Sequence, residues 1–432
     1  MIVTKSKKRT LDIIALASIP FIMVLGNSML IPILPQMKEE LGVTQFQVSL
    51  VITVFSFSAA IMIPLYGFLS DRFGRKKIII PSLFMFATGG LIAGAATWFL
   101  EGETAYWTMI AGRTVQGIGA AGTAPITMAL VGDIFKGGSQ SKVLGLIEAT
   151  NGLGKVVSPI LGTLIAMIFV WFAPFFAFSI LCVLSLIALA FLVKEPPLTS
   201  EPPKFKKYIQ SVAQIFKKEG RWLISTFFVG TIGLFVLFGV LFYLSDILES
   251  LYKVNGLTKG YILAIPLLAM ASTSYITGRL IKKNFPLMKK LIIIGLTLMA
   301  TALIPLMFLD NLYILVALLA LNGIGTGLSL PCINSFITGS VDKSKRGMIT
   351  SLYGSVRFGG VAFGPPIFGW LMTMENWVLF GSNVVLVLIA ILWAMWAIQV
   401  KNKDGSGGGK QQKKESAHTF TWKRVALSKN EG

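Results

Sequence analysis

Long apolar stretches separated by short polar ones recur along this chain of 432 residues. Each is close to the length of about 20 residues that an α-helix needs to cross a bilayer. Backbone polar groups must be satisfied within the membrane, so such stretches are predicted to be helical. The pattern predicts twelve spans, near residues 11–35, 46–69, 78–99, 106–134, 141–169, 171–193, 221–247, 258–281, 288–309, 311–339, 346–372 and 376–399.

Two polar segments divide the chain and give the predicted fold class, an all-α membrane protein of two six-helix halves. Residues 194–220 contain prolines and many lysines, which favours a cytoplasmic linker with an interfacial helix near 205–219. The linker separates an N-terminal half, 1–193, from a C-terminal half, 221–399. Residues 400–432 are polar and Gly-rich, and we expect a disordered basic cytoplasmic tail that contacts lipid headgroups.

The halves share an internal repeat with a constant offset of 206 residues. The repeated pairs are Gly117 and Gly323, Gly119 and Gly325, Pro125 and Pro331, Gly154 and Gly360, Ser158 and Gly364, and Pro159 and Pro365. One offset maintained across two spans and their connection is typical of transporters built from two equivalent halves, with a central cavity between them.

The composition is that of a membrane protein, since hydrophobic residues make up 54% and charged residues 13% of the chain. The net charge of +20 could suggest nucleic acid, but the cations concentrate in alternate loops. The loops predicted to lie outside carry only Lys38, Lys253 and Lys259. This asymmetry follows the positive-inside rule and places both termini in the cytoplasm. We therefore expect contact with anionic lipids, and no nucleic-acid partner.

Residues suited to metal binding or covalent chemistry are scarce. Cys182 and Cys332 lie within apolar spans, so no disulfide is expected, and the single histidine, His418, lies in the tail. We expect no metal site and no cofactor. The spans hold no intramembrane histidine and no acidic pair at helical spacing, which argues against an enzyme. The repeat and the interior charges argue against a passive channel or a sensor.

A tight turn is predicted between the second and third spans. Its sequence is Gly67-Phe-Leu-Ser-Asp71-Arg72-Phe-Gly74-Arg75-Lys-Lys. The glycines allow close helix approach and a sharp reversal, and a carboxylate at the membrane edge needs a partner. We expect Asp71 to accept bonds from amides near 346–348, and Arg75 to pair with Asp133. The alternatives are an ordinary positive-inside loop, which leaves the Gly and Asp spacing unexplained, and a simple surface charge at Asp133.

Three motifs resemble the major facilitator superfamily, in its drug:proton antiporter branch, over about residues 10–400, as judged from expected span lengths. They are the turn above, the run Arg113-Thr-Val-Gln-Gly-Ile-Gly-Ala, and Gly145 followed by Gly154-Lys-Val-Val-Ser158-Pro159-Ile-Leu-Gly162. The last departs from the family pattern at Ser158 and Thr163. The resemblance implies a twelve-helix fold, alternating access, a cytoplasmic latch that stabilises the outward-facing state, and a role for Arg113 in biasing the protonation of an acid. Backbone carbonyls could instead satisfy Arg113.

The fifth span carries small residues at intervals that share one helix face, namely Gly154, Ser158 and Gly162. We expect this face to pack against the eighth span as a sealing and hinging seam, with Pro159 allowing a bend. General helix packing is the alternative. The corresponding residues of the second half are Gly360, Gly364 and Pro365.

Charges within the spans predict the transport site. Glu148 and Lys155 are seven residues apart, about 10 Å along a helix, and Arg357 lies at similar depth in the other half. Glu148 is the acid placed well inside a span, so we predict that it is buried and binds the proton. Asn27, Lys155 and Arg357 are predicted to line the substrate cavity. A buried network with only a structural role is the alternative.

These features together predict a proton-driven exporter in a bacterial cell membrane. The net cationic interior favours a small amphipathic substrate, drug-like or anionic. The alternatives are an exporter of an acidic metabolite such as a siderophore, and a glycolipid flippase. We expect a monomer whose partners are the substrate, protons and membrane lipids.

Overall fold

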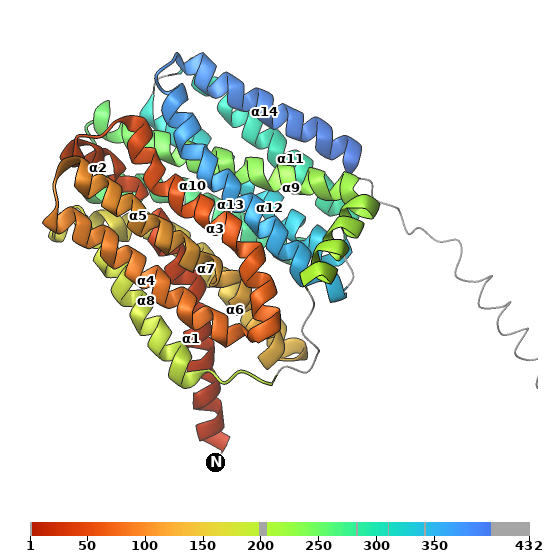
Figure 1. Cartoon of the computed structure of the whole chain (residues 1–432). Coiled ribbons are helices and arrows are strands. Elements are labelled where there is room, and N and C mark those ends of the chain that lie inside the picture. Colours follow the sequence, from red (N-terminus) through yellow and green to blue (C-terminus); the bar gives the residue numbers. More distant parts are fainter. Residues whose placement is uncertain (1, 198–204, 282–283, 310, 341–342, 399–432) are drawn as a thin grey trace, which may run out of the picture. The chain divides into compact units, whose positions relative to one another are not determined.

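The computed structural model describes residues 2–197, 205–281, 284–309, 311–340 and 343–398; the predicted tail and His418 lie outside them. The described chain is helical (Figure 1). Its elements are α1 (Ile2–Ser28), η1 (Ile31–Ile33), α2 (Leu34–Leu41), α3 (Gln45–Phe73), α4 (Arg75–Phe99), α5 (Gly102–Ala121), α6 (Ala124–Ile134), α7 (Gly137–Ile168), α8 (Ala173–Leu192), α9 (Phe205–Ser250), α10 (Gly256–Leu280), α11 (Phe285–Leu303), η2 (Pro305–Met307), α12 (Leu312–Ser340), α13 (Lys343–Leu371) and α14 (Asn376–Ala397).

The predicted fold class is confirmed. Among the described residues, 11 helical segments are long and apolar enough to cross a membrane. The remaining expected span, 346–372, forms α13, whose 29 residues give it the necessary length. It is the more polar helix because Ser351, Tyr353, Ser355 and Arg357 interrupt its apolar sequence.

Some spans differ in detail from their predictions, and proline explains two of the differences. The first span is α1, η1 and α2 in succession, and the span expected at 106–134 is two helices, α5 and α6. Pro32 and Pro125 lie at these breaks; proline donates no backbone hydrogen bond and disfavours helix in the residue before it. The expected linker, 194–220, ends in a helix that continues without a break into the next span, because α9 has 46 residues.

The sequence repeat is also a repeat of packing. A Cβ added to Gly117 of α5 would lie 2.2 Å from the Phe55 carbonyl oxygen of α3. Its counterpart Gly323 of α12 would place a Cβ 2.3 Å from the Pro266 carbonyl oxygen of α10. Both glycines are required because any side chain would overlap backbone that cannot move aside. Corresponding helices of the two halves therefore meet at corresponding residues.

The two halves meet along α3 with α13 and α7 with α10. Thr53 of α3 donates to the Ala362 carbonyl oxygen at 2.8 Å, and Ser355 of α13 donates to the Ala60 carbonyl oxygen at 2.5 Å. On the other side, Gly260 of α10 lies so close to α7 that an added Cβ would be 2.3 Å from Thr163 Oγ1. Small and hydroxyl-bearing residues thus allow close contact between the halves.

Candidate functional site

The turn between α3 and α4 marks one end of the helix bundle, which we call the loop end. Gly74 links the two helices with φ of 109°, a conformation that favours glycine. Its amide still donates to the Ser70 carbonyl oxygen at 3.1 Å, so α3 closes just before α4 begins at Arg75. Gly67 faces α13, where an added Cβ would lie 2.8 Å from Ser351 Oγ. The glycines of the motif therefore serve the reversal and the contact between halves.

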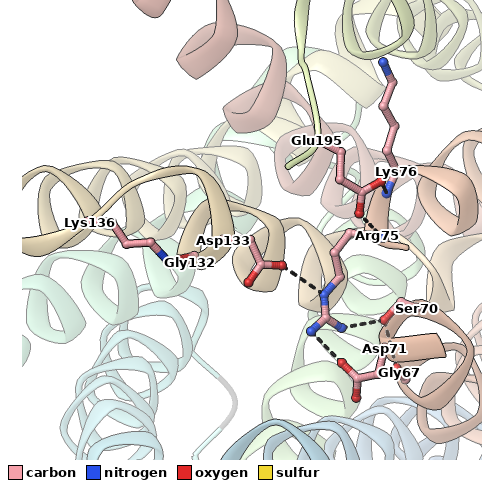
Figure 2. Close-up of polar contacts among 9 residues, drawn as sticks. All are labelled: Gly67, Ser70, Asp71, Arg75, Lys76, Gly132, Asp133, Lys136 and Glu195. Atoms are coloured by element: carbon pink, nitrogen blue, oxygen red, sulfur yellow. Dashed lines mark hydrogen bonds and ion pairs between the residues drawn. The ribbon is translucent and has the colours of Figure 1, made fainter. Parts of the chain in front are cut away.

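Arg75 is the centre of a polar cluster in this turn (Figure 2). Its guanidinium lies 2.5 Å from Asp71 and 3.4 Å from Asp133, and it donates to Ser70 Oγ at 2.7 Å. The expected contact between Arg75 and Asp133 is thus present. We call Ser70, Asp71, Arg75 and Asp133 the Arg75 cluster; all of them belong to the N-terminal half.

Asp71 and Arg72, the other charged residues of the motif before Arg75, have separate contacts. The described ion pair of Asp71 is with Arg75, and its expected contact with the amides near 346–348 stays a prediction. Arg72 lies over the ring of Phe73, 5.6 Å from its centroid. No described contact connects it to the Arg75 cluster. The two neighbouring arginines of the motif therefore have different surroundings.

Glu195, which follows α8, was missed by the sequence reasoning. Its carboxylate accepts from the backbone amides of Arg75 and of Lys76, the latter at 3.2 Å (Figure 2). The Lys76 ammonium in turn donates to the carbonyl oxygens of Ala190 and Val193 at 2.8 and 2.7 Å, at the end of α8. A carboxylate at a helix N-terminus and a cation at a helix C-terminus are both favourable. The only sequence signal was an acid next to the end of a span.

Arg113 of α5 is fully buried, with its charge satisfied inside the N-terminal half. It donates to the carbonyl oxygens of Val51 and Gly26 at 2.9 and 2.8 Å, to Asn27 Oδ1 at 3.1 Å, and to Gln116 Oε1. Among the described residues these acceptors include no carboxylate. This geometry matches the alternative given in the sequence analysis, in which backbone carbonyl oxygens accept the hydrogen bonds of the Arg113 guanidinium. Asn27 Oδ1 is engaged by Arg113, and the predicted contact of Asn27 with a substrate stays a prediction.

The small-residue face of α7 packs differently from the prediction. Cβ atoms added at Gly154 and Gly162 would meet Phe21 of α1 at 3.2 Å and the carbonyl oxygen of Met29, the residue after α1, at 2.2 Å. The expectation that this face meets the eighth span, α10, is therefore wrong. Ser158 bonds within α7 to the Gly154 carbonyl oxygen. The spacing identified a close-packing face, but it could not identify which neighbour fills it.

The repeat extends to this packing in the C-terminal half. Cβ atoms added at Gly360 and Gly364 of α13 would meet the carbonyl oxygens of Thr231 and Phe235 of α9, at 2.3 and 2.6 Å. Each of these glycine faces thus packs on the first long helix of its own half. The contact between α7 and α10 is made by other residues, with Gly260 against Pro159 and Thr163. Pro159 and Pro365 lie within unbroken helices, α7 and α13.

The predicted burial of Glu148 is wrong, since its side chain is exposed. The reason is the helix face on which it lies: Val143 and Ile147 are buried on the other face of α7, whereas a Cβ added at Gly145 would meet nothing within 4 Å. The helix contacts α1 at Thr150, whose hydroxyl lies 3.3 Å from the Ala17 carbonyl oxygen. An exposed acid can exchange protons with its surroundings without a buried relay.

Lys155 and Arg357, one from each half, lie within electrostatic range of each other. Lys155 of α7 lies close enough to Arg357 of α13, and to Glu148 on its own helix, for electrostatic interaction. Arg357 lies 5.3 Å from the centroid of the Tyr353 ring, and its Nε atom is buried without a hydrogen-bond partner among the described residues. The structure therefore places two cations, one from each half, in one electrostatic environment.

Lys259 was assigned to an outer loop but lies in the first turn of α10, with a relative exposure of 1%. Its ammonium pairs with Glu249 at 2.6 Å. Next to it, Gln45 of α3 donates to Asp246 of α9 at 3.1 Å, across the halves. This polar group lies at the end of the bundle opposite the loop end. A lone lysine at a span boundary gave no sequence signal for burial.

The fold, its repeat and the turn between α3 and α4 are those of one class of membrane protein. The family model of the Major Facilitator Superfamily matches residues 16–289 and 252–429, and the chain belongs to this family of transporters. It is 44% identical over 395 residues to the bacillibactin exporter of Bacillus subtilis, covering 91% of this chain and 98% of that protein. The similarity supports an efflux transporter.

Other relatives share the family at lower identity. The multidrug efflux protein YfmO of Bacillus subtilis is 26% identical over 347 residues, which cover 80% of this chain and 83% of that protein. Among solved structures, a bacterial homologue of the human lysosomal transporter Spinster, crystallised inward-facing and unoccupied, matches with a TM-score of 0.74 and 16% identity. That match covers 93% of this chain and 99% of the solved one, and it shows the fold alone.

Proposed function

We propose that this transporter exports an anionic, acceptor-rich amphipathic molecule of the siderophore kind in exchange for protons. The observation that carries this proposal is the pair of interior cations, Lys155 and Arg357, contributed by opposite halves. The similarity to a bacillibactin exporter favours the siderophore class within that chemistry.

The charges of the pair favour an anionic substrate. A charged side chain at membrane depth costs several kcal/mol unless it faces water or a partner. Neither Lys155 nor Arg357 has an ion pair among the described residues, so acidic or acceptor groups of a substrate would supply what they lack. Because the two cations lie on different halves, a ligand bound to both would respond to the relative movement of the halves.

Glu148 couples this site to protons. While its carboxylate is charged it offsets Lys155, and protonation removes that attraction and frees the cation for the substrate. Release of the substrate then favours loss of the proton. Exchange thus follows because the Glu148 carboxylate and the substrate compete for Lys155, and the proton and the substrate need not touch.

The same proposal gives the protein an orientation. The cation-rich loops, including that between α3 and α4, lie in the cytoplasm of a bacterial cell, with both termini on that side. The protein acts as a monomer without a cofactor, driven by the proton gradient. We assign no enzymatic reaction, because its family and its relatives are transporters.

Transport by purified protein in proteoliposomes tests the proposal. We expect uptake of bacillibactin driven by an imposed proton gradient, lost in Lys155→Met and Arg357→Met and retained in Lys136→Met, which removes an exposed cation near the loop end. Glu148→Gln should keep substrate binding but lose the response to the gradient. Preference for lipophilic cations, or normal export by both methionine variants, would contradict the proposal.

A multidrug exporter is the second candidate, because YfmO and other relatives carry that function in their names. The same assay with a panel of neutral and cationic drugs decides between the two. Transport of a glycolipid between leaflets, measured with a labelled lipid in the same vesicles, would instead favour a flippase.

A further inference from the structure

An apolar groove of about 390 Å³ opens on the C-terminal half between α9, α13 and α14. It arises because α13 and α14 both pack on α9 but make few contacts with each other. Its walls include Phe228, Val356 and Trp393. Ile224 and Val356 are 44% and 38% exposed, so the groove faces outward rather than into the space between the halves.

Cations continue this groove toward the loop end of α9. Lys217, Arg221, Ile224 and Phe228 follow one another at intervals of four, three and four, which places them on one helix face. Lys217 and Arg221 are both exposed. Glu219, the acid in this stretch, lies on the other side of the helix, where it accepts from Trp222 Nε1 at 2.7 Å. The face thus changes from apolar to cationic within two turns.

Arg221 is held in position over the end of α14. Its guanidinium lies 3.8 Å from the centroid of the Trp396 ring and donates to the Trp396 carbonyl oxygen at 3.1 Å. A guanidinium has five donors, and the described contacts of Arg221 use one acceptor. The remaining donors can bind a phosphate, for which the planar guanidinium is well suited.

The depth of Arg221 fits a lipid headgroup. Residues 222–245 of α9 carry no charge, and these 24 residues extend about 36 Å, slightly more than the hydrocarbon core of a bilayer. Arg221 therefore lies at the membrane surface. The groove continues from it to Thr231, about 15 Å along the helix, which is half of the hydrocarbon core and hence the depth of one leaflet.

We infer that this groove is a binding site for one anionic phospholipid. An acyl chain lies between α13 and α14 against Phe228 and Trp393, and the phosphate binds Lys217 and Arg221. The cations select the headgroup and the groove holds the chain. Bulk lipid would also cover an apolar surface, so preference for an anionic headgroup is what distinguishes a built site.

Native mass spectrometry of the purified full chain tests this inference with phosphatidylglycerol and phosphatidylcholine of identical acyl chains. We expect phosphatidylglycerol to bind at least tenfold more tightly. Lys217→Gln and Arg221→Gln should each weaken it about fivefold, the effect of one cation near an anionic headgroup, and leave phosphatidylcholine unchanged. Val356→Trp, which fills the groove from an exposed position, should weaken both lipids.

Arg279→Gln is the matched control, because Arg279 is also an exposed arginine over an aromatic ring, 4.2 Å from the Tyr275 centroid, and lies away from the groove. Equal binding of the two lipids would overturn the inference. So would losses in the groove variants no larger than that in Arg279→Gln. Lys217→Gln keeps the test valid if Arg221→Gln loosens α14. The readout does not involve transport, so its outcome is independent of the proposed function.

Discussion

Replacement of Arg75 by glutamine should destabilise the N-terminal half by about 2 kcal/mol. The hydrogen bond to Ser70 Oγ at 2.7 Å involves a charged donor and contributes about 1.5 kcal/mol. The pair with Asp71 at 2.5 Å is partly exposed and adds up to about 1 kcal/mol. The pair with Asp133 at 3.4 Å adds little, because the Asp133 side chain is 47% exposed and screened by solvent.

Thermal denaturation in detergent measures this effect. For a unit of this size, about 2 kcal/mol corresponds to a decrease in midpoint of about 4–8 °C. Arg72→Gln removes the same charge from the adjacent helix end, where Arg72 lies over Phe73 outside the Arg75 cluster, and should change the midpoint little. Salt should reduce the difference only in part, because the Ser70 bond is less sensitive to screening than the ion pairs. Equal losses in the two variants would refute the role assigned to the Arg75 cluster.

Two further substitutions test the packing and the missed residue. Glu195→Gln should lower the free energy of unfolding by about 1 kcal/mol, because it removes a carboxylate from the α4 N-terminus. Its control is Glu101→Gln, which lies at a helix start without a side-chain capping bond and should be neutral. Equal denaturation midpoints in the two variants would contradict this. Gly162→Ala should lower the free energy of unfolding by about 1–3 kcal/mol, because its Cβ would meet the Met29 carbonyl oxygen. Gly145→Ala is the control: its Cβ would meet nothing within 4 Å, so it should be tolerated or stabilising. Folded Gly162→Ala protein with an unchanged midpoint would show that the backbone at Met29 can move aside.

The sequence predicted most of the fold because the membrane restricts the possible structures. Length and hydropathy alone located the spans, and the constant offset of 206 between glycine pairs gave the equivalence of the halves. The ends of helices were less predictable. Proline at 125 broke a span, whereas its counterpart at 331 lies within unbroken α12. Local sequence allows both outcomes, and tertiary packing decides between them.

The candidate site was only partly predictable, for a related physical reason. Arg75 and Asp133 could be paired in advance because both lie at helix ends on one side of the membrane. Glu148 could not be placed, because its exposure depends on which face of α7 packs on other helices, and its position within a span does not settle that face. Glu195 was missed because it acts on backbone amides, which leave no trace in side-chain patterns.

The contacts between the halves indicate how such a protein can change conformation at low cost. None of the three ion pairs among the described residues crosses from one half to the other. The crossing bonds are instead single hydrogen bonds, such as those from Thr53 to Ala362 and from Ser245 to Ile31. Each of these neutral bonds contributes only about 1 kcal/mol, because water can replace either partner when the halves separate, and the bond from Gln45 to the charged Asp246 contributes about 1.5–3 kcal/mol. Ion pairs thus lie within each half, and single hydrogen bonds, one of them to the Asp246 carboxylate, join the two, which is compatible with rigid-body alternating access.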